Sequence, residues 1–455
     1  MKKILSIILL FAAGLTFTAC QSEEDDLFSS SAAERLAASK VTYTQRLPQA
    51  TAGWVMEYYP TNGDEWPRGS GYLILAKFNS DKSVRMASQN DEMTDDVFME
   101  DTSLWEVIAD QGPVLSFNTY NQCLHSFADP AIYETGLGLE GDYEFEIINL
   151  EENAQFAMLK GKKRGTYVRM SRLDEGTDFK EYLASVTAFH KKMFNTNVPN
   201  KVYISFGDKR YVVTNTENKF MSFYPEGGDE ISQTESHPFL ISKRGGDYYL
   251  RFRDAFEREE MADKVQEMRY DSIQDKFIGV ENEQFTIEGY PPHSFFYEYA
   301  NEKGDHKFEV NVGDEMSDKF KTYMDNLSAE FATLKNKNKP YTFVGLRMTW
   351  NARNESFQWV VRYTPGTSTA TSSAYNYNFE MAGDRVKFTY VAPGADAKGS
   401  VDAATNVRNA LSSVAAITDL MSQEFVVTAY QTTFDLTKMK LTSASDPDLW
   451  FVVSI

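Results

Sequence analysis

The sequence predicts a mainly β protein of the α+β class, built from antiparallel β-sandwich or barrel-like units that each follow an amphipathic helix. Stretches of alternating apolar and polar residues recur along the chain, with turn-forming residues roughly every ten positions. Helical periodicity appears ahead of three such runs. At 455 residues the chain is too long for one hydrophobic core, and its 14% aromatic content is typical of packed structure. We therefore expect three folded units.

The first unit is expected to span residues 31–176. Its helix covers residues 31–49, with Ser30 or Ser31 as the N-cap. A turn at residues 79–83 joins two of the strands as a hairpin. The predicted strands are residues 53–60, 72–78, 84–87, 104–109, 114–118, 143–149 and 155–160.

The second and third units are expected at residues 177–313 and 314–455. Each begins with a helix, at residues 178–194 and 316–334, in which apolar residues recur at three- and four-residue spacing. A further helix at about residues 403–421 is inserted into the last unit. The predicted strands are residues 201–206, 210–214, 220–224, 239–242, 248–252, 277–280, 285–287, 341–350, 356–364, 376–381, 385–391, 425–429, 433–435 and 450–455.

The N-terminus predicts a lipoprotein signal peptide over residues 1–19. Lys2 and Lys3 precede an apolar run at residues 4–17, and Ala19 stands before Cys20. The run is shorter than the roughly 20 residues that a membrane-spanning helix needs. We therefore expect cleavage before Cys20, lipid attachment to its thiol and stable anchoring by several acyl chains.

Residues 20–30 are expected to form a lipidated acidic tether. Four consecutive carboxylates at residues 23–26 repel one another and keep this segment extended. The segment resembles the acidic signal that Bacteroidetes lipoproteins carry when they are exported to the outer face of the outer membrane. A solvated spacer is the alternative. The expected location is the outer membrane, lipid-anchored and facing the extracellular side.

Charge and cysteine content exclude several classes of protein. The net charge of -20 argues against nucleic acid as a partner. Once Cys20 carries lipid, Cys123 is the only thiol left, so no internal disulfide is expected. His125 lies two residues after Cys123, but an unpaired cysteine usually behaves as a small core residue, and we expect a buried, inert thiol.

No cofactor or metal site is predicted. Residues 136–141 spell a dinucleotide-binding pattern, but the alternating residues 142–147 predict a following strand where cofactor binding requires a helix. No two of the five histidines have the three- or four-residue separation that places zinc ligands on one helix face. These are His125, His190, His237, His293 and His306.

No catalytic residue can be assigned either. Carboxylates are abundant, as at Asp254, Glu257, Glu259 and Glu260, but the sequence does not single out a pair at the separation that glycoside hydrolysis needs. Trp66 is the candidate ligand-binding residue, because its loop does not require a large ring for a core. The alternative is that this ring folds back onto its own unit.

Several co-ordered motifs resemble a Bacteroidetes surface lipoprotein family that is catalogued as domain of unknown function 4302. The resemblance is dense to about residue 175, and it rests on Gly53-Trp54, Phe78-x-x-Asp81, residues 112–121, His125-Ser126-Phe127-x-Asp129-Pro130, Gly141-Asp142-Tyr143-Glu144-Phe145 and residues 161–165. It assigns no catalytic residue. It implies a setting beside an outer-membrane nutrient-uptake system, a TonB-type transporter with its lipoprotein lid.

These observations favour a non-enzymatic binding or accessory module of an uptake system, with a glycan or a peptide as the ligand. One alternative is a hydrolase with an unrecognised carboxylate pair. The other is a structural subunit of a transporter assembly that binds no small molecule.

Overall fold

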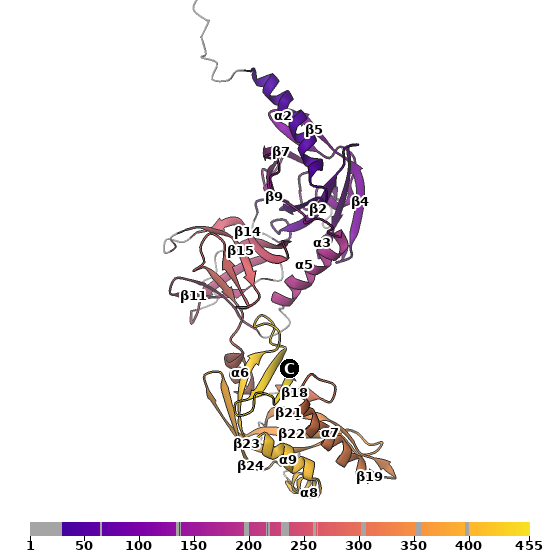
Figure 1. Ribbon diagram of the computed structural model, residues 1–455, viewed down its shortest axis with the longest axis vertical. Coiled ribbons are helices and arrows are strands. Elements are labelled where there is room, and N and C mark those ends of the chain that lie inside the picture. The colour runs from indigo at the N-terminus through magenta and orange to yellow at the C-terminus, as the bar shows by residue number, and fades with distance from the viewer. Residues whose placement is uncertain are drawn as a thin grey trace, which may run out of the picture.

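The protein is mainly β and consists of three β units that follow one another along its long axis (Figure 1). The computed structural model describes residues 30–455 apart from 64–65, 133–135, 137, 195–199, 215, 217–218, 229–235, 258–260, 262, 302–305, 352–355 and 396–399. The fold class that the sequence predicts, with barrel-like antiparallel units, is confirmed. Within the described residues, no helix has the length and apolar character needed to cross a membrane.

The first unit is a nine-stranded antiparallel sheet in the order β4-β3-β2-β1-β9-β8-β7-β6-β5. Its edge strands β4 and β5 are separated in the chain only by Trp105, and the sheet curls around an aromatic core that includes Trp54, Tyr58 and Phe145. Helix α2 (Ala32–Arg46) precedes it and begins at Ser31, which forms a capping box with Glu34. The other elements are η1 (Leu47–Gln49), β1 (Trp54–Tyr58), β2 (Tyr72–Phe78), β3 (Ser83–Ser88), α3 (Asp91–Thr94), β4 (Met99–Leu104), β5 (Glu106–Ala109), β6 (Pro113–Ser116), α4 (Gln122–His125), β7 (Glu144–Asn149), β8 (Phe156–Gly161) and β9 (Tyr167–Arg172).

The middle unit is a closed eight-stranded barrel preceded by α5 (Phe179–Met193). Helix α5 begins where the sequence predicts, because the Asp178 side chain accepts a hydrogen bond from the backbone N–H of Glu181. The strands are β10 (Val202–Phe206), β11 (Lys209–Thr214), β12 (Phe220–Pro225), β13 (His237–Arg244), β14 (Asp247–Phe256), β15 (Val265–Asp271), β16 (Lys276–Gly279) and β17 (Thr286–Glu288).

The third unit is a second closed eight-stranded barrel. Its first strand, β18 (Lys307–Asn311), pairs with β21 and β27, so the start predicted at residue 314 lies too late. Helix α7 (Asp318–Thr333) therefore lies inside the unit instead of ahead of it. The other elements are α6 (Pro292–Asn301), β19 (Lys335–Asn336), β20 (Lys339–Pro340), β21 (Thr342–Asn351), β22 (Ser356–Thr364), β23 (Thr371–Ala382), β24 (Arg385–Pro393), α8 (Asp402–Ala410), α9 (Ser412–Leu420), β25 (Glu424–Ala429), β26 (Lys438–Ser443) and β27 (Trp450–Ser454).

Helix α5 joins the first sheet to the middle barrel (Figure 1). Val55, Leu75 and Ala87 point outward from the first sheet and belong to the same apolar cluster as Leu183 and Val186 of α5. The core of the middle barrel completes that cluster. Burying apolar surface from both units in one cluster favours a fixed arrangement of the two.

A buried ion cluster lies at the same junction. Glu57 on the outer face of β1 accepts two hydrogen bonds from Arg169 of β9, at 2.9 and 2.7 Å. The carboxylate also pairs with Arg251 of the middle barrel, whose Nε lies 3.1 Å from Oε2. Arg169 contacts Glu267, which also binds Arg244. The cluster thus ties strands of both units together with charge-assisted hydrogen bonds.

The loop after β25 connects the third barrel to the middle barrel through direct contacts. Phe434, 1% exposed, inserts into the core of the middle barrel, where its ring centre lies 5.8 Å from that of Phe277. Asp275 accepts hydrogen bonds from the hydroxyl of Thr432 and from the backbone N–H of Thr433. The strand predicted at residues 433–435 is therefore wrong, because this segment serves as an inter-unit contact.

Two other predicted elements are interrupted, and strands β9 (Tyr167–Arg172), β15, β18 and β26 were not predicted. The helix expected at residues 403–421 is broken, because Leu411 adopts an extended conformation between α8 and α9. The strand expected at residues 104–109 is divided at Trp105, whose backbone N–H donates to Lys82 O. Both breaks let the chain change direction and bury an apolar side chain.

Candidate functional site

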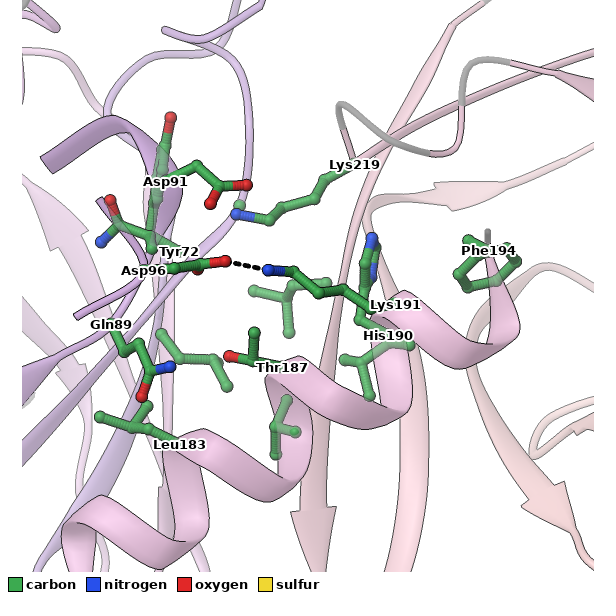
Figure 2. Close-up of a pocket in the computed structure, with 16 residues that line it drawn as sticks. Tyr72, Gln89, Asp91, Asp96, Leu183, Thr187, His190, Lys191, Phe194 and Lys219 are labelled. Carbon is green, nitrogen blue, oxygen red and sulfur yellow. Dashed lines mark hydrogen bonds and ion pairs between the residues drawn. The ribbon is translucent and has the colours of Figure 1, made fainter. Parts of the chain in front are cut away.

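A cavity of about 480 Å³ lies where the first sheet, α5 and the middle barrel meet (Figure 2). Strand β2 and the segment around α3 form one wall, α5 forms the base, and β13 with the turn before β12 closes the other side. We call it the junction cavity. Pockets between units are common ligand sites.

The base and inner wall of the junction cavity are apolar. One face of α5 contributes Leu183 and Val186, and Phe194 lies at the C-terminal end of this helix. Leu240 and Ile241 of β13 add to this surface, together with Leu73 of β2. A ligand that displaces water from these side chains gains hydrophobic free energy.

Carboxylates and lysines form the rim. Asn90 caps α3 by accepting the backbone N–H of Met93 at 2.8 Å, and the chain then turns through Asp95 and Asp96 in left-handed conformations. This turn directs Asp96 toward Lys191 of α5, with which it forms an ion pair (Figure 2). The rim is thus built from two units.

Asp91 and Asp96 differ in acidity. The pKa of Asp91 is raised, mainly by hydrogen bonding with Asp96, and burial adds to it. Burial opposes ionisation of Asp96, but hydrogen bonds with Lys191 and Asp91 outweigh it and lower the pKa of Asp96. The hydrogen bond that Lys191 donates to Asp96 likewise raises the pKa of Lys191. Asp96 is therefore the more acidic member of the pair.

Lys219 enters from the middle barrel, opposite Asp91 (Figure 2). Its Nζ lies 4.9 Å from the centre of the Tyr72 ring and 4.0 Å from Oε2 of Glu92. The Glu92 side chain is only 7% exposed, and Oε2 lacks a hydrogen-bond partner among the described residues. Anion and cation thus face each other across the rim.

His190 lines the cavity and is held neutral. Burial lowers its pKa to about 3, with further lowering from Lys219 and Lys191. In the described structure its Nε2 is inaccessible to solvent and without a hydrogen-bond partner. A neutral imidazole at neutral pH leaves the ionic character of the rim to the carboxylates and lysines.

Trp66, the residue proposed from sequence to bind ligand, lies beside the junction cavity and not in its lining. The side chain is 47% exposed, and its indole N–H donates to Oε1 of Glu92 at 3.2 Å. The Trp66–Pro67 peptide bond is cis. Tyr72, which lines the cavity, donates its hydroxyl to Pro67 O at 2.9 Å. Trp66 thus hydrogen-bonds Glu92 beside the cavity, and its role as a ligand residue stays a prediction.

The other candidate residues lie elsewhere. Cys123 is buried in the core of the first sheet, and burial raises the pKa of its thiol to about 12. Strand β7 follows the glycines of residues 136–141 closely, in the place where dinucleotide binding would require a helix. Glu259 and Glu260 lie outside the described residues, as does Cys20. Among the described residues, no group of three or more potential metal ligands comes together.

Sequence analysis did not identify Asp91, Asp96, Lys191 and Lys219. They come from α3, the turn after it, α5 and the turn before β12, and no local motif connects them. Only indirect features of the sequence indicated where these residues would lie. Asn90 followed by acidic residues indicates a helix N-terminus, and the basic end of the periodic segment at residues 178–194 indicates where α5 ends.

The protein thus belongs to a class with several antiparallel β units in series and a cavity between two of them. The residues that line this cavity lie between positions 71 and 241. The chain belongs to the family described as Domain of unknown function (DUF4302), whose sequence profile matches residues 24–272. The junction cavity and Trp66 lie within the matched range, whereas the third barrel lies outside it. No curated protein matches this chain.

Solved structures that match at low similarity are bacterial DNA polymerase III beta subunits. The Pseudomonas aeruginosa protein is 9% identical, with 90% of this chain and 95% of that chain covered and a TM-score of 0.14. The Bartonella birtlesii sliding clamp is 10% identical, with 91% and 97% covered and a TM-score of 0.11. These TM-scores are too low to carry an argument about fold or function.

Proposed function

We propose that this chain is a surface lipoprotein of the outer membrane that captures a small nutrient molecule, without transforming it, as part of an uptake system. The junction cavity carries the proposal, because it combines an apolar base with a rim of opposite charges. A short apolar peptide fits this chemistry best. Its free ammonium group would contact Asp96 and Asp91, its carboxylate would contact Lys219, and its side chains would cover Leu183 and Leu240.

The ligand test uses residues 27–455 and calorimetric titration with Leu-Leu and Leu-Gly-Leu, each with a free and with an acetylated N-terminus. We expect binding of the free peptides and at least tenfold weaker binding of the acetylated ones. The variant Asp96→Asn should weaken binding of the free peptides at least tenfold. Asp95→Asn is the matched control, because Asp95 is an exposed neighbour outside the cavity lining. If none of the free peptides binds, the proposed ligand class is wrong.

The hydrolase alternative would assign catalysis to the Asp91–Asp96 pair. Carboxyl groups that act on a glycosidic bond are separated by roughly 5 Å or more. The apolar base and the charged rim of the junction cavity support binding over glycoside hydrolysis. Turnover of a chromogenic glycoside or peptide substrate, lost in Asp91→Asn while the fold is retained, would reverse this ranking.

The membrane anchor is proposed from Cys20 and the acidic tether, which precede the described residues. Cys20→Ala should release the protein from the membrane fraction while its unfolding midpoint in the soluble fraction stays that of residues 27–455. Protease treatment of intact cells should remove the anchored protein if it faces the medium. Membrane association that is unchanged in Cys20→Ala would contradict lipid anchoring.

The proposed partner is an outer-membrane transporter. The third barrel, which lies outside the range matched by the family and does not contribute to the junction cavity, is free to serve this contact. Crosslinking in native membranes followed by purification through this chain should recover the transporter. Recovery of this chain alone would contradict an assembly with a transporter.

A further inference from the structure

We propose a second ligand site on the first sheet, a groove that takes a neutral sugar and whose lining includes the ring of Tyr143. The groove has a volume of about 600 Å³ and lies between α4 and the β8–β9 turn, with Tyr143 at its edge. We call it the ring groove. Its residues are distinct from those of the junction cavity.

Three rings stand in a stack beside the groove. The ring centre of His125 lies 5.3 Å from that of Tyr120 and 4.8 Å from that of Tyr143, with interplanar angles of 33° and 24°. Tyr120 is 57% exposed and Tyr143 is 44% exposed. Flat exposed rings of this kind offer apolar faces to a ligand at low cost in side-chain entropy.

The central ring is fixed by the backbone. Nδ1 of His125 accepts a hydrogen bond from the backbone N–H of Asn121 at 3.0 Å. Nε2 must then carry the proton and donate to Phe117 O, 3.1 Å away. Burial lowers the pKa of His125, which keeps this tautomer neutral. A ring held at both nitrogens orders the tyrosines that stack on it and prepares the surface for a ligand.

Several of the charged side chains of the ring groove are already paired. Lys162 bridges Asp110 at 2.7 Å and Glu144 at 3.4 Å, and Arg164 binds Glu140 at 2.6 Å. Its described lining contains three acidic and three basic side chains. A charged ligand would have to break these pairs, whereas hydroxyl groups can add hydrogen bonds to them. The junction cavity differs in its apolar base, since its rim charges are also partly paired, as Asp96 is with Lys191.

The groove wall leaves little room for rearrangement. The buried carboxylate of Asp142 accepts the backbone N–H groups of Lys163 and Arg164, at 3.1 and 2.8 Å. A Cβ atom at Gly161 would lie 2.2 Å from Oδ2 of Asp142, so only glycine allows this approach. The motif residues Gly141–Phe145 and 161–165 thus shape the groove instead of a catalytic centre. A polyhydroxyl ligand with one apolar face, a pyranose, suits a rigid wall beside a ring.

The test uses residues 27–455 and calorimetric titration with the neutral hexasaccharides of glucose, xylose and mannose, and with anionic hexagalacturonate. We expect at least one neutral sugar to bind and to bind more tightly than hexagalacturonate. Tyr143→Ala should weaken that binding at least tenfold, and Tyr143→Phe should keep it within about threefold. Tyr167→Ala is the matched control, because Tyr167 is also 57% exposed but lies outside the groove lining and the ring stack.

The outcomes separate this site from the junction cavity. Sugar binding that is lost in Tyr143→Ala and kept in Asp96→Asn supports the ring groove. Sugar binding that is unchanged in Tyr143→Ala and in Tyr120→Ala overturns it, as does the failure of all three neutral sugars to bind. Peptide binding by the Tyr143→Ala variant reports on the proposed function independently, so either proposal can fail alone.

Discussion

The buried carboxylate of Glu57 offers a direct test of how the first sheet and the middle barrel are joined. Glu57 is 2% exposed and receives hydrogen bonds from Arg169, while Nε of Arg251 lies 3.1 Å away. The change Glu57→Gln keeps the shape of the side chain and removes its charge. The cluster of three arginines then retains a single carboxylate, that of Glu267.

The expected cost is about 3 kcal/mol of unfolding free energy. Removing one partner of a buried ion pair costs roughly 3–5 kcal/mol, because the other charge stays buried without compensation. The lower end applies here, since Arg169 still contacts Glu267 and the glutamine oxygen still accepts a hydrogen bond. Arg251 loses the most stabilisation. Burial already lowers its pKa, and the nearby charge of Glu57 does most to oppose that lowering.

Native-state hydrogen exchange measures this cost locally, which suits a chain of three units that need not unfold together. Backbone amides of β1 and β13 should lose about 3 kcal/mol of protection in Glu57→Gln, while those of the third barrel stay unchanged. Glu100→Gln is the control: its partner Arg85 is 40% exposed, and less than about 1 kcal/mol should be lost. A loss below 1 kcal/mol in Glu57→Gln would refute the assigned role of the cluster.

Three further predictions concern other buried groups. Because burial lowers the pKa of His190 to about 3 from 6.5, the unfolded chain binds a proton below pH 6.5 that the folded chain does not. Stability should therefore fall by about 1.4 kcal/mol per pH unit below 6.5, and His190→Gln should remove this slope between pH 6.5 and 5 in denaturant titrations. Phe434→Ala should lower the unfolding free energy of the middle barrel by about 3–5 kcal/mol and expose the junction of the two barrels to limited proteolysis. The control Ile273→Ala, at a side chain that is 95% exposed, should do neither. Cys123 should resist thiol reagents in the folded chain and react only after unfolding, because burial raises the pKa of its thiol to about 12. Rapid labelling of the folded protein would contradict its buried position.

Local signals predicted much of the secondary structure. The predicted cap at Ser31 and the helical periodicity from residue 178 mark helix starts that the structure reproduces, and the side chains of Ser31 and Asp178 each accept a backbone N–H there. Strands such as β8 and β24 likewise follow alternating patterns, whereas β1 and β13 are buried on both faces. Closure of the two barrels could not be predicted from the sequence, because the pairing of β10 with β17 depends on long-range register that no local pattern encodes.

The candidate site was less predictable than the fold. Trp66 stood out by its size and its loop, yet it lies outside the lining of the junction cavity. Asp96 and Lys191 were inconspicuous, because ordinary charged residues become a site only when α5 packs across the first sheet. The strand predicted at residues 433–435 failed for a similar reason: its apolar and polar residues alternate because Phe434 enters another unit while Thr433 binds Asp275.

The range matched by the family ends inside a folded unit. Residue 272 follows β15, so the matched range omits β16 and β17, which close the middle barrel, as well as Phe434, which fills its core. Without them β10 and β15 would present open edges, and the apolar cluster around α5 would lose Phe277 and Ile287. The base of the junction cavity belongs to that same cluster. The site therefore lies within the matched residues, but the structure that holds it in place extends through the middle barrel and into the third.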